Sequence, residues 1–362
     1  MSKNPKKLWT VDPREALRAG EGFRLAALDR NGTPGWEGSK KDAKSLMATR
    51  AELLPELQER LFAEGRTGGK RAVLCVIQGL DTAGKGGIVR HVMGYVDPQG
   101  VALHSFGVPS AEERKHHYLW RIRKALPPAG RIGVFDRSHY EDVLVVRVNE
   151  LVPEEEWQKR YEEINKFEAD LVASGTIVLK FALMVSHAEQ GLRLMERLDR
   201  SDKHWKYTTG DLQTRSKWPE FQTAYQAVFE RTSTEHAPWY VLPADHKWYS
   251  RLAITEILTR TLSEMQLTFP KADWDVADER RKLAESMSTQ TLAQSLAETR
   301  DNVESAMNES FEVRQEVAAF PGVDDQTAQR TATDSREAWA AELDAAITQK
   351  KELLAERPDY TG

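Results

Sequence analysis

The chain has 362 residues and a formal net charge of −5, with 40% hydrophobic and 30% charged residues, as in an ordinary globular protein. No run approaches the roughly 18 consecutive apolar residues that a membrane span requires, so we expect no membrane partner. The charge is uneven along the chain: residues 271–362 contain 11 basic and 20 acidic residues, which leaves 40 and 36 for residues 1–270. The first three quarters are therefore mildly basic, and local charge is what steers a charged ligand.

The N-terminus and the cysteine usage indicate a cytoplasmic protein. The basic segment at residues 1–7 is not followed by an apolar segment, so we expect no secretory signal. Cys75 is the one cysteine of the chain and lies inside an apolar run. A lone thiol makes no internal disulfide, and we expect Cys75 to be a small buried hydrophobic residue.

The elements alternate along the chain. Residues 1–40 are rich in Gly, Pro and charge and predict an irregular N-terminal arm, after which leucines at helical spacing predict a helix over 41–64. Apolar runs of strand length follow at 72–77, 101–106, 132–135, 176–185 and 239–242. Amphipathic stretches between and after them lie at 87–94, 111–126, 153–174 and 247–265.

This alternation predicts an α/β protein, a three-layer α/β/α sandwich around a parallel sheet with right-handed crossovers. Residues 187–237 carry no convincing strand and are rich in Arg, Lys and aromatic residues, so we expect a helical lid there, inside a domain of residues 41–270. Residues 271–362 predict an acidic helical extension, with one helix between Leu283 and Phe311, a break at Pro321-Gly322 and another helix between Trp339 and Leu354. A partly disordered appendage is the alternative for this tail.

A phosphate-binding loop follows the first strand and precedes a helix. The stretch GLDTAGKGG has the G-x-x-x-x-G-K spacing of a Walker A motif. Its glycines let backbone N–H groups approach phosphate oxygens, and the lysine adds a full positive charge. The expected phosphate-binding residues are Gly79, Gly84, Lys85, Gly86 and Gly87. A glycine-rich turn without a ligand is the alternative.

The position after the lysine departs from the usual motif. Gly86 stands where a Ser or Thr would bind Mg²⁺, so a metal needs another ligand. Asp81 lies inside the loop and would repel a phosphate unless a cation lay between them, so we expect Asp81 to be a metal ligand. A structural turn residue is the alternative for Asp81.

A second acidic residue ends the strand at 132–135. Asp136 has the Walker B position, which predicts that it holds or orients Mg²⁺ at the carboxyl end of the sheet. Arg137 beside it is expected to clamp the transferred phosphoryl group, with a structural ion pair as the alternative. Both residues are candidates for the catalytic set together with Asp81 and Lys85.

The lid region supplies further cations. Arg193 and Arg197 are spaced i,i+4 and share one face of the predicted helix, where they would neutralise phosphate charge and exclude water. Lys203 and Lys206 follow. Acidic residues are interspersed, so a solvated, salt-bridged helical face stays open as an alternative. Aromatic residues among cations also suit single-stranded nucleic acid, but nothing else supports that ligand and we expect no nucleic-acid partner.

The stretches GLDTAGKGG, FDRSHYEDVLVVRV, RLDRSDKHWKY, DLQTRSKW and APWYVLPADHKW resemble the family-2 polyphosphate kinases in order and spacing, over residues 22–270. The chain is most similar to the single-domain subgroup, which includes enzymes that phosphorylate AMP as well as ADP. The resemblance implies a P-loop kinase-like fold with a helical lid, and it implies that Arg193, Arg197, Lys203 and Lys206 contact phosphate. It also implies that Glu141 accommodates the nucleotide. No motif of the family covers the tail.

The activity implied by this resemblance is phosphoryl transfer between inorganic polyphosphate and AMP or ADP, giving ADP or ATP. The implied cofactor is Mg²⁺, with Mn²⁺ as the alternative ion. An ATP-dependent nucleotide or small-molecule kinase on the same fold is the first alternative function, and a non-catalytic P-loop binding module is the second. Exposed helical faces favour a homo-oligomer of undetermined number.

Overall fold

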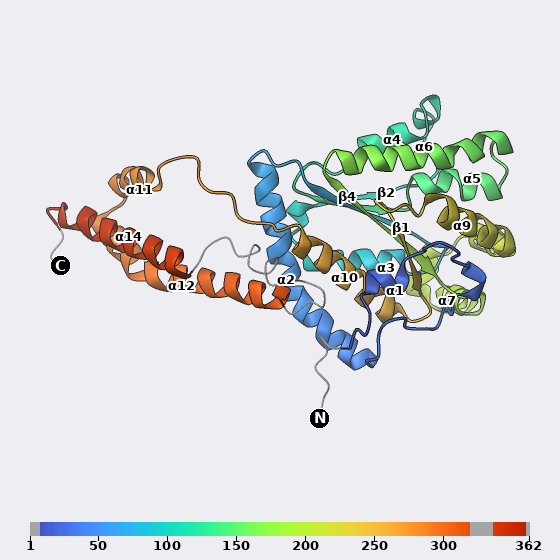
Figure 1. The fold of residues 1–362 in the computed structure, drawn as a ribbon, viewed down its shortest axis with the longest axis horizontal. Coiled ribbons are helices and arrows are strands. Elements are labelled where there is room, and N and C mark those ends of the chain that lie inside the picture. The colour runs from blue at the N-terminus through green and yellow to red at the C-terminus, as the bar shows by residue number, and fades with distance from the viewer. Residues whose placement is uncertain (1–7, 319–335, 360–362) are drawn as a thin grey trace. The chain divides into compact units, whose positions relative to one another are not determined.

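A computed structural model describes residues 8–318 and 336–359 of the chain. The chain divides into two compact units, Met1–Leu262 and Ser263–Gly362 (Figure 1). The first unit contains a single five-stranded parallel sheet. The functional division of the chain at residues 40 and 270 stays a prediction.

The sheet confirms all five predicted strands. They are β1 (Ala72–Gln78), β2 (Val101–Ser105), β3 (Ile132–Asp136), β4 (Thr176–Met184) and β5 (Trp239–Pro243). Their order in the sheet is β2-β3-β1-β4-β5, so the chain passes from β1 to the edge strand β2, returns to place β3 between β2 and β1, and then adds β4 and β5 on the other side of β1. All seven residues of β1 are buried, as its continuous apolar run predicts for a central parallel strand. Cys75 lies fully buried within it.

Helices cover both faces of the sheet, and the predicted three-layer α/β/α class is confirmed (Figure 1). The helices of the first unit are α1 (Pro13–Leu17), α2 (Lys40–Arg66), α3 (Lys85–His91), α4 (Leu119–Lys124), α5 (Val145–Val148), α6 (Glu154–Ala173), α7 (His187–Asp199), α8 (Thr209–Ser216), α9 (Trp218–Thr232) and α10 (Lys247–Glu264). Helices α4 and α6 lie over one face, and α2, α3 and α10 lie over the other. A capping box between Ser39 and Asp42 fixes the start of α2.

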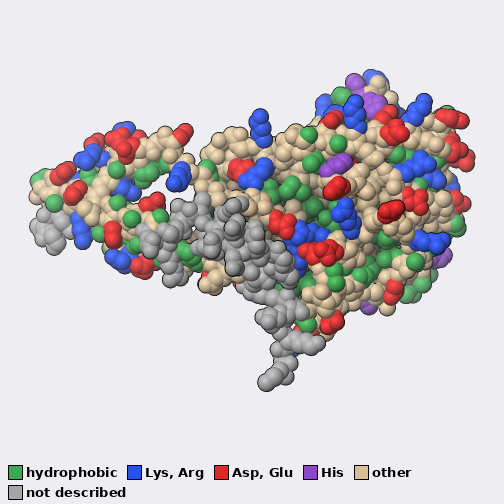
Figure 2. All heavy atoms as spheres, in the orientation of Figure 1, with side chains coloured by type: hydrophobic (Ala, Val, Ile, Leu, Met, Phe, Trp, Pro, Cys, Tyr) green, Lys and Arg blue, Asp and Glu red, His purple; other side chains and the backbone are tan. Residues whose placement is uncertain are grey.

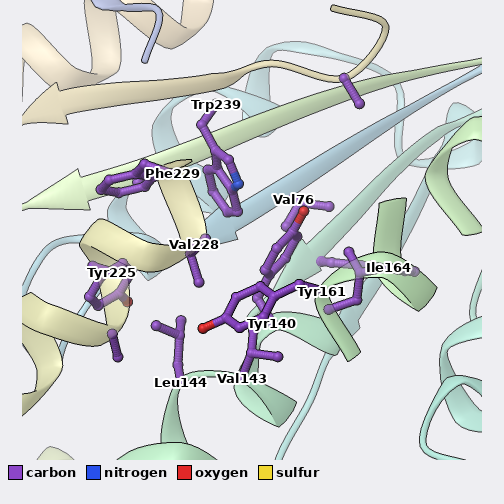
Figure 3. Close-up of a cluster of buried hydrophobic side chains, with 14 of the residues drawn as sticks. Val76, Tyr140, Val143, Leu144, Tyr161, Ile164, Tyr225, Val228, Phe229 and Trp239 are labelled. Atoms are coloured by element: carbon purple, nitrogen blue, oxygen red, sulfur yellow. The ribbon is translucent and has the colours of Figure 1, made fainter. Parts of the chain in front are cut away.

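The core on the α6 side is built around aromatic residues (Figure 3). Tyr140 and Trp239 lie 4.7 Å apart between ring centroids, in an edge-to-face arrangement that suits buried aromatic pairs. Helix α9 packs Phe221, Val228 and Phe229 into the same cluster. The second half of the segment expected to form the lid is therefore anchored in the core.

The stretch at 111–126 was predicted as one helix, and that prediction is wrong. Residues Glu113–Lys115 form a single 3₁₀ turn, and α4 begins only at Leu119. The two helical pieces have separate starts and are divided by the extended backbone of His116. Ser110 and Glu113 exchange side-chain hydrogen bonds with each other's backbone N–H, and the chain then becomes extended at His116.

The described part of the N-terminal segment is irregular but packed. Its only helical pieces are α1 and a 3₁₀ turn at Leu25–Ala27. Trp9 and Trp36 are buried and lie 5.3 Å apart between ring centroids. The Ala19 N–H donates to the Trp239 carbonyl at 2.8 Å, so this segment covers an edge of the sheet at β5.

The second unit is helical, with α11 (Val276–Glu285), α12 (Thr289–Ala318) and α14 (Arg336–Ala355). Its small core contains Ala284, Leu292, Leu353 and Leu354. The single helix predicted between Leu283 and Phe311 is wrong, because the chain breaks after α11 and Ser288 caps α12 by accepting from Thr291 N–H at 3.1 Å. The predicted break at Pro321-Gly322 lies outside the described residues. No helix in the part of the chain that the structure describes is long and apolar enough to cross a membrane.

A buried ion pair lies at the centre of the first unit. Lys180 on β4 and Glu168 on α6 are both fully buried, and Lys180 Nζ lies 2.6 Å from Glu168 Oε2. The Lys180 ammonium also donates to the Tyr140 hydroxyl at 2.8 Å and to the Thr232 carbonyl at 2.6 Å. Burial alone would raise the pKa of Glu168, but Lys180 and the hydrogen bond from His139 lower it below its ordinary value.

We expect Lys180→Met to lower the free energy of unfolding by about 3–5 kcal/mol, because it leaves the Glu168 carboxylate buried without its cation. Urea unfolding at neutral pH measures the change. Since the pKa of Glu168 is lowered in the folded state, the carboxylate's stabilising contribution is present at neutral pH and is lost as the pH falls through that lowered pKa.

The matched control is Lys166→Met, which changes an exposed lysine on the same helix as Glu168. It should change the free energy of unfolding by no more than about 0.5 kcal/mol. Equal stabilities for the two variants would contradict the role given to the buried pair.

Candidate active site

The register of two parallel strands brings the two main sequence motifs together. Ile77 on β1 is paired with Asp136 on β3, and the Arg137 N–H donates to the Ile77 carbonyl at 3.1 Å. Parallel strands end at the same edge of a sheet. The loop after β1 and the Asp136-Arg137 pair after β3 therefore lie side by side at the carboxyl edge, where ligands of such folds bind.

The loop from Gly79 to Gly84 takes backbone conformations that favour glycine. Gly79 has φ +157° and Gly84, which precedes α3, has φ +116°. A Cβ on Gly79 would also lie 2.8 Å from the Leu183 carbonyl oxygen, so β4 approaches too closely for a side chain. Thr82 adopts φ +67° without being glycine, and such strain is retained where the surrounding structure enforces it.

Lys85 folds back over the loop that precedes it. Its Nζ donates to the Gly79 carbonyl at 2.6 Å. Burial lowers the pKa of Lys85, and the Asp81 carboxylate opposes that shift. The ammonium is therefore held among acidic groups at the centre of the site, where an incoming phosphate can replace a carbonyl as its partner.

Arg137 bridges the two motifs. Its Nη2 lies 3.2 Å from Asp81 Oδ1, and its backbone is in the left-handed region at φ +63°. Burial alone would lower the pKa of Arg137, but Glu141, Asp81 and Asp136 raise it. The sequence left two roles open for Arg137, a structural ion pair and a clamp on the phosphoryl group. The half-exposed guanidinium is compatible with both roles.

Glu141 lies behind Arg137 on the 3₁₀ turn His139–Asp142. In the orientation that satisfies both of its neighbours, the Gln78 amide donates to Glu141 Oε1 at 3.0 Å and accepts from Ser138. Burial raises the pKa of Glu141, and the Arg137 and Lys85 cations oppose that shift. The sequence did not identify Gln78 as a partner of Glu141, because Gln78 is only a polar residue at the end of an apolar strand.

Two carboxylates are available for a metal ion. Asp81 and Asp136 both line the same cavity as the loop. No three His, Cys, Asp or Glu side chains in the described ranges form a metal-binding group. A pair of carboxylates suits Mg²⁺, which keeps several waters and completes its coordination with substrate phosphates rather than with an all-protein cage.

Arg193 on α7 joins the lid helix to the loop. It is only 6% exposed, and its guanidinium donates to the carbonyls of Thr82 at 3.0 Å and Ala244 at 2.8 Å. Its Nε also lies 2.7 Å from Glu189 Oε1. The expected contact of Arg193 with phosphate stays a prediction. In this structure the hydrogen bonds of Arg193 connect α7 with the phosphate loop and with the residue that follows β5.

The other lid cations are held less tightly. Arg197 donates to the Lys206 carbonyl at 2.9 Å and pairs with Asp211 at 3.2 Å, and Lys203 pairs with Glu196. Within the described residues Lys206 has no ion-pair partner, and its ammonium lies 4.8 Å from the ring centroid of Trp205. Several lid cations are thus salt-bridged, as the sequence left open, yet remain beside the cavity.

A cavity of about 1220 Å³, called here the larger cavity, brings most of these residues together. The expected site residues that line it are Asp81, Gly84, Lys85, Gly86, Gly87, Asp136, Arg137, Arg193, Arg197, Lys203 and Lys206. Gly79 and Glu141 do not line it. It is also lined by Arg90, Lys247 and Arg251. Lys247 lies in the stretch APWYVLPADHKW that contributes to the family resemblance, whereas Arg90 and Arg251 lie in none of the stretches that contribute to it. The i,i+4 spacing of Lys247 and Arg251 at the start of α10 is the signal that would have found Arg251.

Comparison with known proteins is consistent with this geometry. The model of the polyphosphate kinase 2 family matches residues 37–270. An AMP/ADP-polyphosphate phosphotransferase from Meiothermus ruber is 45% identical over 251 residues, 69% of this chain and 92% of that protein. An ADP-polyphosphate phosphotransferase from Rhodopseudomonas palustris is 39% identical over 269 residues, 70% of this chain and 91% of that protein. The crystal structure of polyphosphate kinase 2 from Arthrobacter aurescens is 50% identical with a TM-score of 0.74, covering 76% of this chain and 98% of that one. The chain belongs to the polyphosphate kinase 2 family.

Proposed function

We propose that this protein transfers phosphoryl groups between inorganic polyphosphate and AMP or ADP, forming ADP or ATP. The observation that carries the proposal is the larger cavity, in which the phosphate loop, the Asp136-Arg137 pair and the lid cations all meet. The names of the Meiothermus and Rhodopseudomonas relatives support polyphosphate as donor and adenine nucleotides as acceptors.

The reaction requires little proton chemistry. A terminal phosphate oxygen of the nucleotide, already ionised at neutral pH, attacks the terminal phosphorus of polyphosphate in line with the bridging oxygen. The new P–O bond forms as the bond to the bridging oxygen breaks, and the donor leaves one phosphate shorter. Catalysis then depends on positioning and on stabilising negative charge, the role proposed for Lys85 and Arg137, which both line the larger cavity.

The two carboxylates of the cavity would hold Mg²⁺, with Mn²⁺ as the alternative ion. Asp81 and Asp136 are the residues for this role, and each carries an oxygen set of the type that Mg²⁺ prefers. The ion would supply positive charge to the phosphate oxygens. Asp81 Oδ1 also lies 3.2 Å from Arg137 Nη2, so one carboxylate would bind the metal ion and the Arg137 guanidinium.

Nucleotide production by the purified chain tests the proposal. We expect ATP from ADP, and ADP from AMP, when the protein is given Mg²⁺ and long-chain polyphosphate with no ATP present. Chromatography of the nucleotides measures the products. If neither product forms while an ATP-dependent transfer to a small molecule occurs, the donor is ATP and the proposal is wrong.

We expect Lys85→Ala and Asp136→Ala each to lower kcat by at least about 100-fold, because each removes a charge that acts on the transferred phosphoryl group. Steady-state ATP formation from ADP measures the loss. Lys70→Ala is the matched control, since Lys70 is exposed and precedes β1 at the opposite edge of the sheet. A loss of similar size in the control would contradict a specific role for Lys85.

We expect Asp81→Ala to need a higher Mg²⁺ concentration for half-maximal activity, because one of two carboxylate ligands is lost. A titration of activity with Mg²⁺ at saturating nucleotide measures the shift. Asp81→Asn separates charge from geometry, since its amide keeps an oxygen that can accept from Arg137. An unchanged Mg²⁺ requirement in both variants would contradict the metal assignment.

A further inference from the structure

A second cavity adjoins the first. It has a volume of about 630 Å³ and is called here the smaller cavity. Four residues line both cavities, His91, Arg193, Lys247 and Arg251, so the two are contiguous. Part of the additional lining of the smaller cavity comes from the start of α2 and includes Lys40 and Lys44, which no sequence motif connects with the site.

The smaller cavity is strongly cationic. Its lining contains five Lys and Arg side chains, Lys40, Lys44, Arg193, Lys247 and Arg251. It contains two carboxylates, and both have partners: Glu189 pairs with Arg193 at 2.7 Å, and Asp245 accepts from the Ser186 N–H at 2.7 Å. The surface is not basic everywhere, since Lys and Arg are interspersed with Asp and Glu on the face drawn in Figure 2. The cationic lining is therefore a local feature.

Three of these five cations make no hydrogen bond or ion pair in the part of the chain that the structure describes, although the carboxylates of Glu189 and Glu196 lie close enough to oppose the lowering of the pKa of Lys247 by burial. Within residues 8–318 and 336–359, the structure gives no hydrogen bond or ion pair to the side chains of Lys44, Lys247 and Arg251. Burial lowers the pKa of Lys247 and of Arg251, so keeping each of these side chains charged in a partly buried place carries a cost in free energy. An anion bound between them would offset that cost.

The cations form two pairs at helical spacing. Lys40 and Lys44 are i,i+4 on α2, and Lys247 and Arg251 are i,i+4 on α10, so each pair presents one face of its helix. Arg251 also reaches the phosphate loop, because a Cβ on Gly87 would lie 3.2 Å from its Nη2. The charges thus continue from the loop that receives the reacting phosphate to the start of α2.

We propose that the smaller cavity binds the part of a polyphosphate chain that lies beyond the reacting phosphates, and that Lys40 and Lys44 make the enzyme favour long donors over short ones. This inference rests on the proposed function. A nucleobase is the other occupant that the lining would suit, since His246 and Trp248 stack at 5.8 Å between ring centroids. The unpaired cations favour a polyanion, because a base offers them no negative charge.

The test is the double variant Lys40→Gln, Lys44→Gln in the full chain. We expect the KM for long-chain polyphosphate to rise about five-fold, because two exposed cation–phosphate pairs are lost. The dependence of that KM on salt should become shallower, since fewer cations contact the chain. The inhibition constant of tripolyphosphate, the kcat and the KM for ADP should not change, because these report on the larger cavity.

The matched control is Lys41→Gln. Lys41 is exposed and lies between the two lysines in sequence, but it lines neither cavity. An unchanged KM for long polyphosphate in the double variant would overturn the inference, and so would an equal weakening of tripolyphosphate. A rise in the KM for ADP alone would assign the cavity to a nucleotide. Failure of the wild-type chain to use polyphosphate at all would instead contradict the proposed function.

Discussion

The parallel pairing of β1 with β3 is the constraint on which the site depends. Its register sets Ile77 opposite Asp136, and the Arg137 N–H continues the ladder to the Ile77 carbonyl. Because side chains alternate along a strand, a slip of one residue would move Asp136 to the other face of the sheet. The register is itself held by apolar residues buried on both faces of β1. Burial of the central strand thus fixes where charge can meet phosphate.

The buried ion pair of Lys180 and Glu168 also helps to position the site. The 3₁₀ turn that holds Glu141 begins at His139 and Tyr140, and both of these side chains contact Glu168. Glu168 in turn binds Lys180 on β4. The turn is therefore bound to α6 and, through Lys180, to β4. These contacts hold the neighbouring Arg137 in its left-handed backbone conformation. A charged network in the core positions residues at the surface of the cavity.

The sequence predicted the sheet well because each strand is a continuous apolar run bounded by polar residues, and the loop after β1 has a spacing that few other structures share. It failed where local backbone conformation and capping divide a predicted helix, as at the extended His116 before α4 and at Ser288, which caps α12. It also did not reveal that Arg193 binds backbone carbonyls, nor that α2 contributes lysines to a cavity. Those facts depend on tertiary contacts between segments far apart in the chain, which periodicity does not encode.

The cations of the site divide into two kinds, and the difference explains how an acidic chain can serve a polyanion. Arg137 and Arg193 are held by carboxylates and carbonyls, so their positions are set before any ligand binds. Preorganised charge of this kind acts on the transition state, because it needs no reorganisation during the reaction. Lys44, Lys247 and Arg251 make no hydrogen bond or ion pair within the described residues, and the role proposed for them is to attract the donor rather than to fix its position. The net charge of −5 is dominated by the tail after residue 270, so it does not oppose either role.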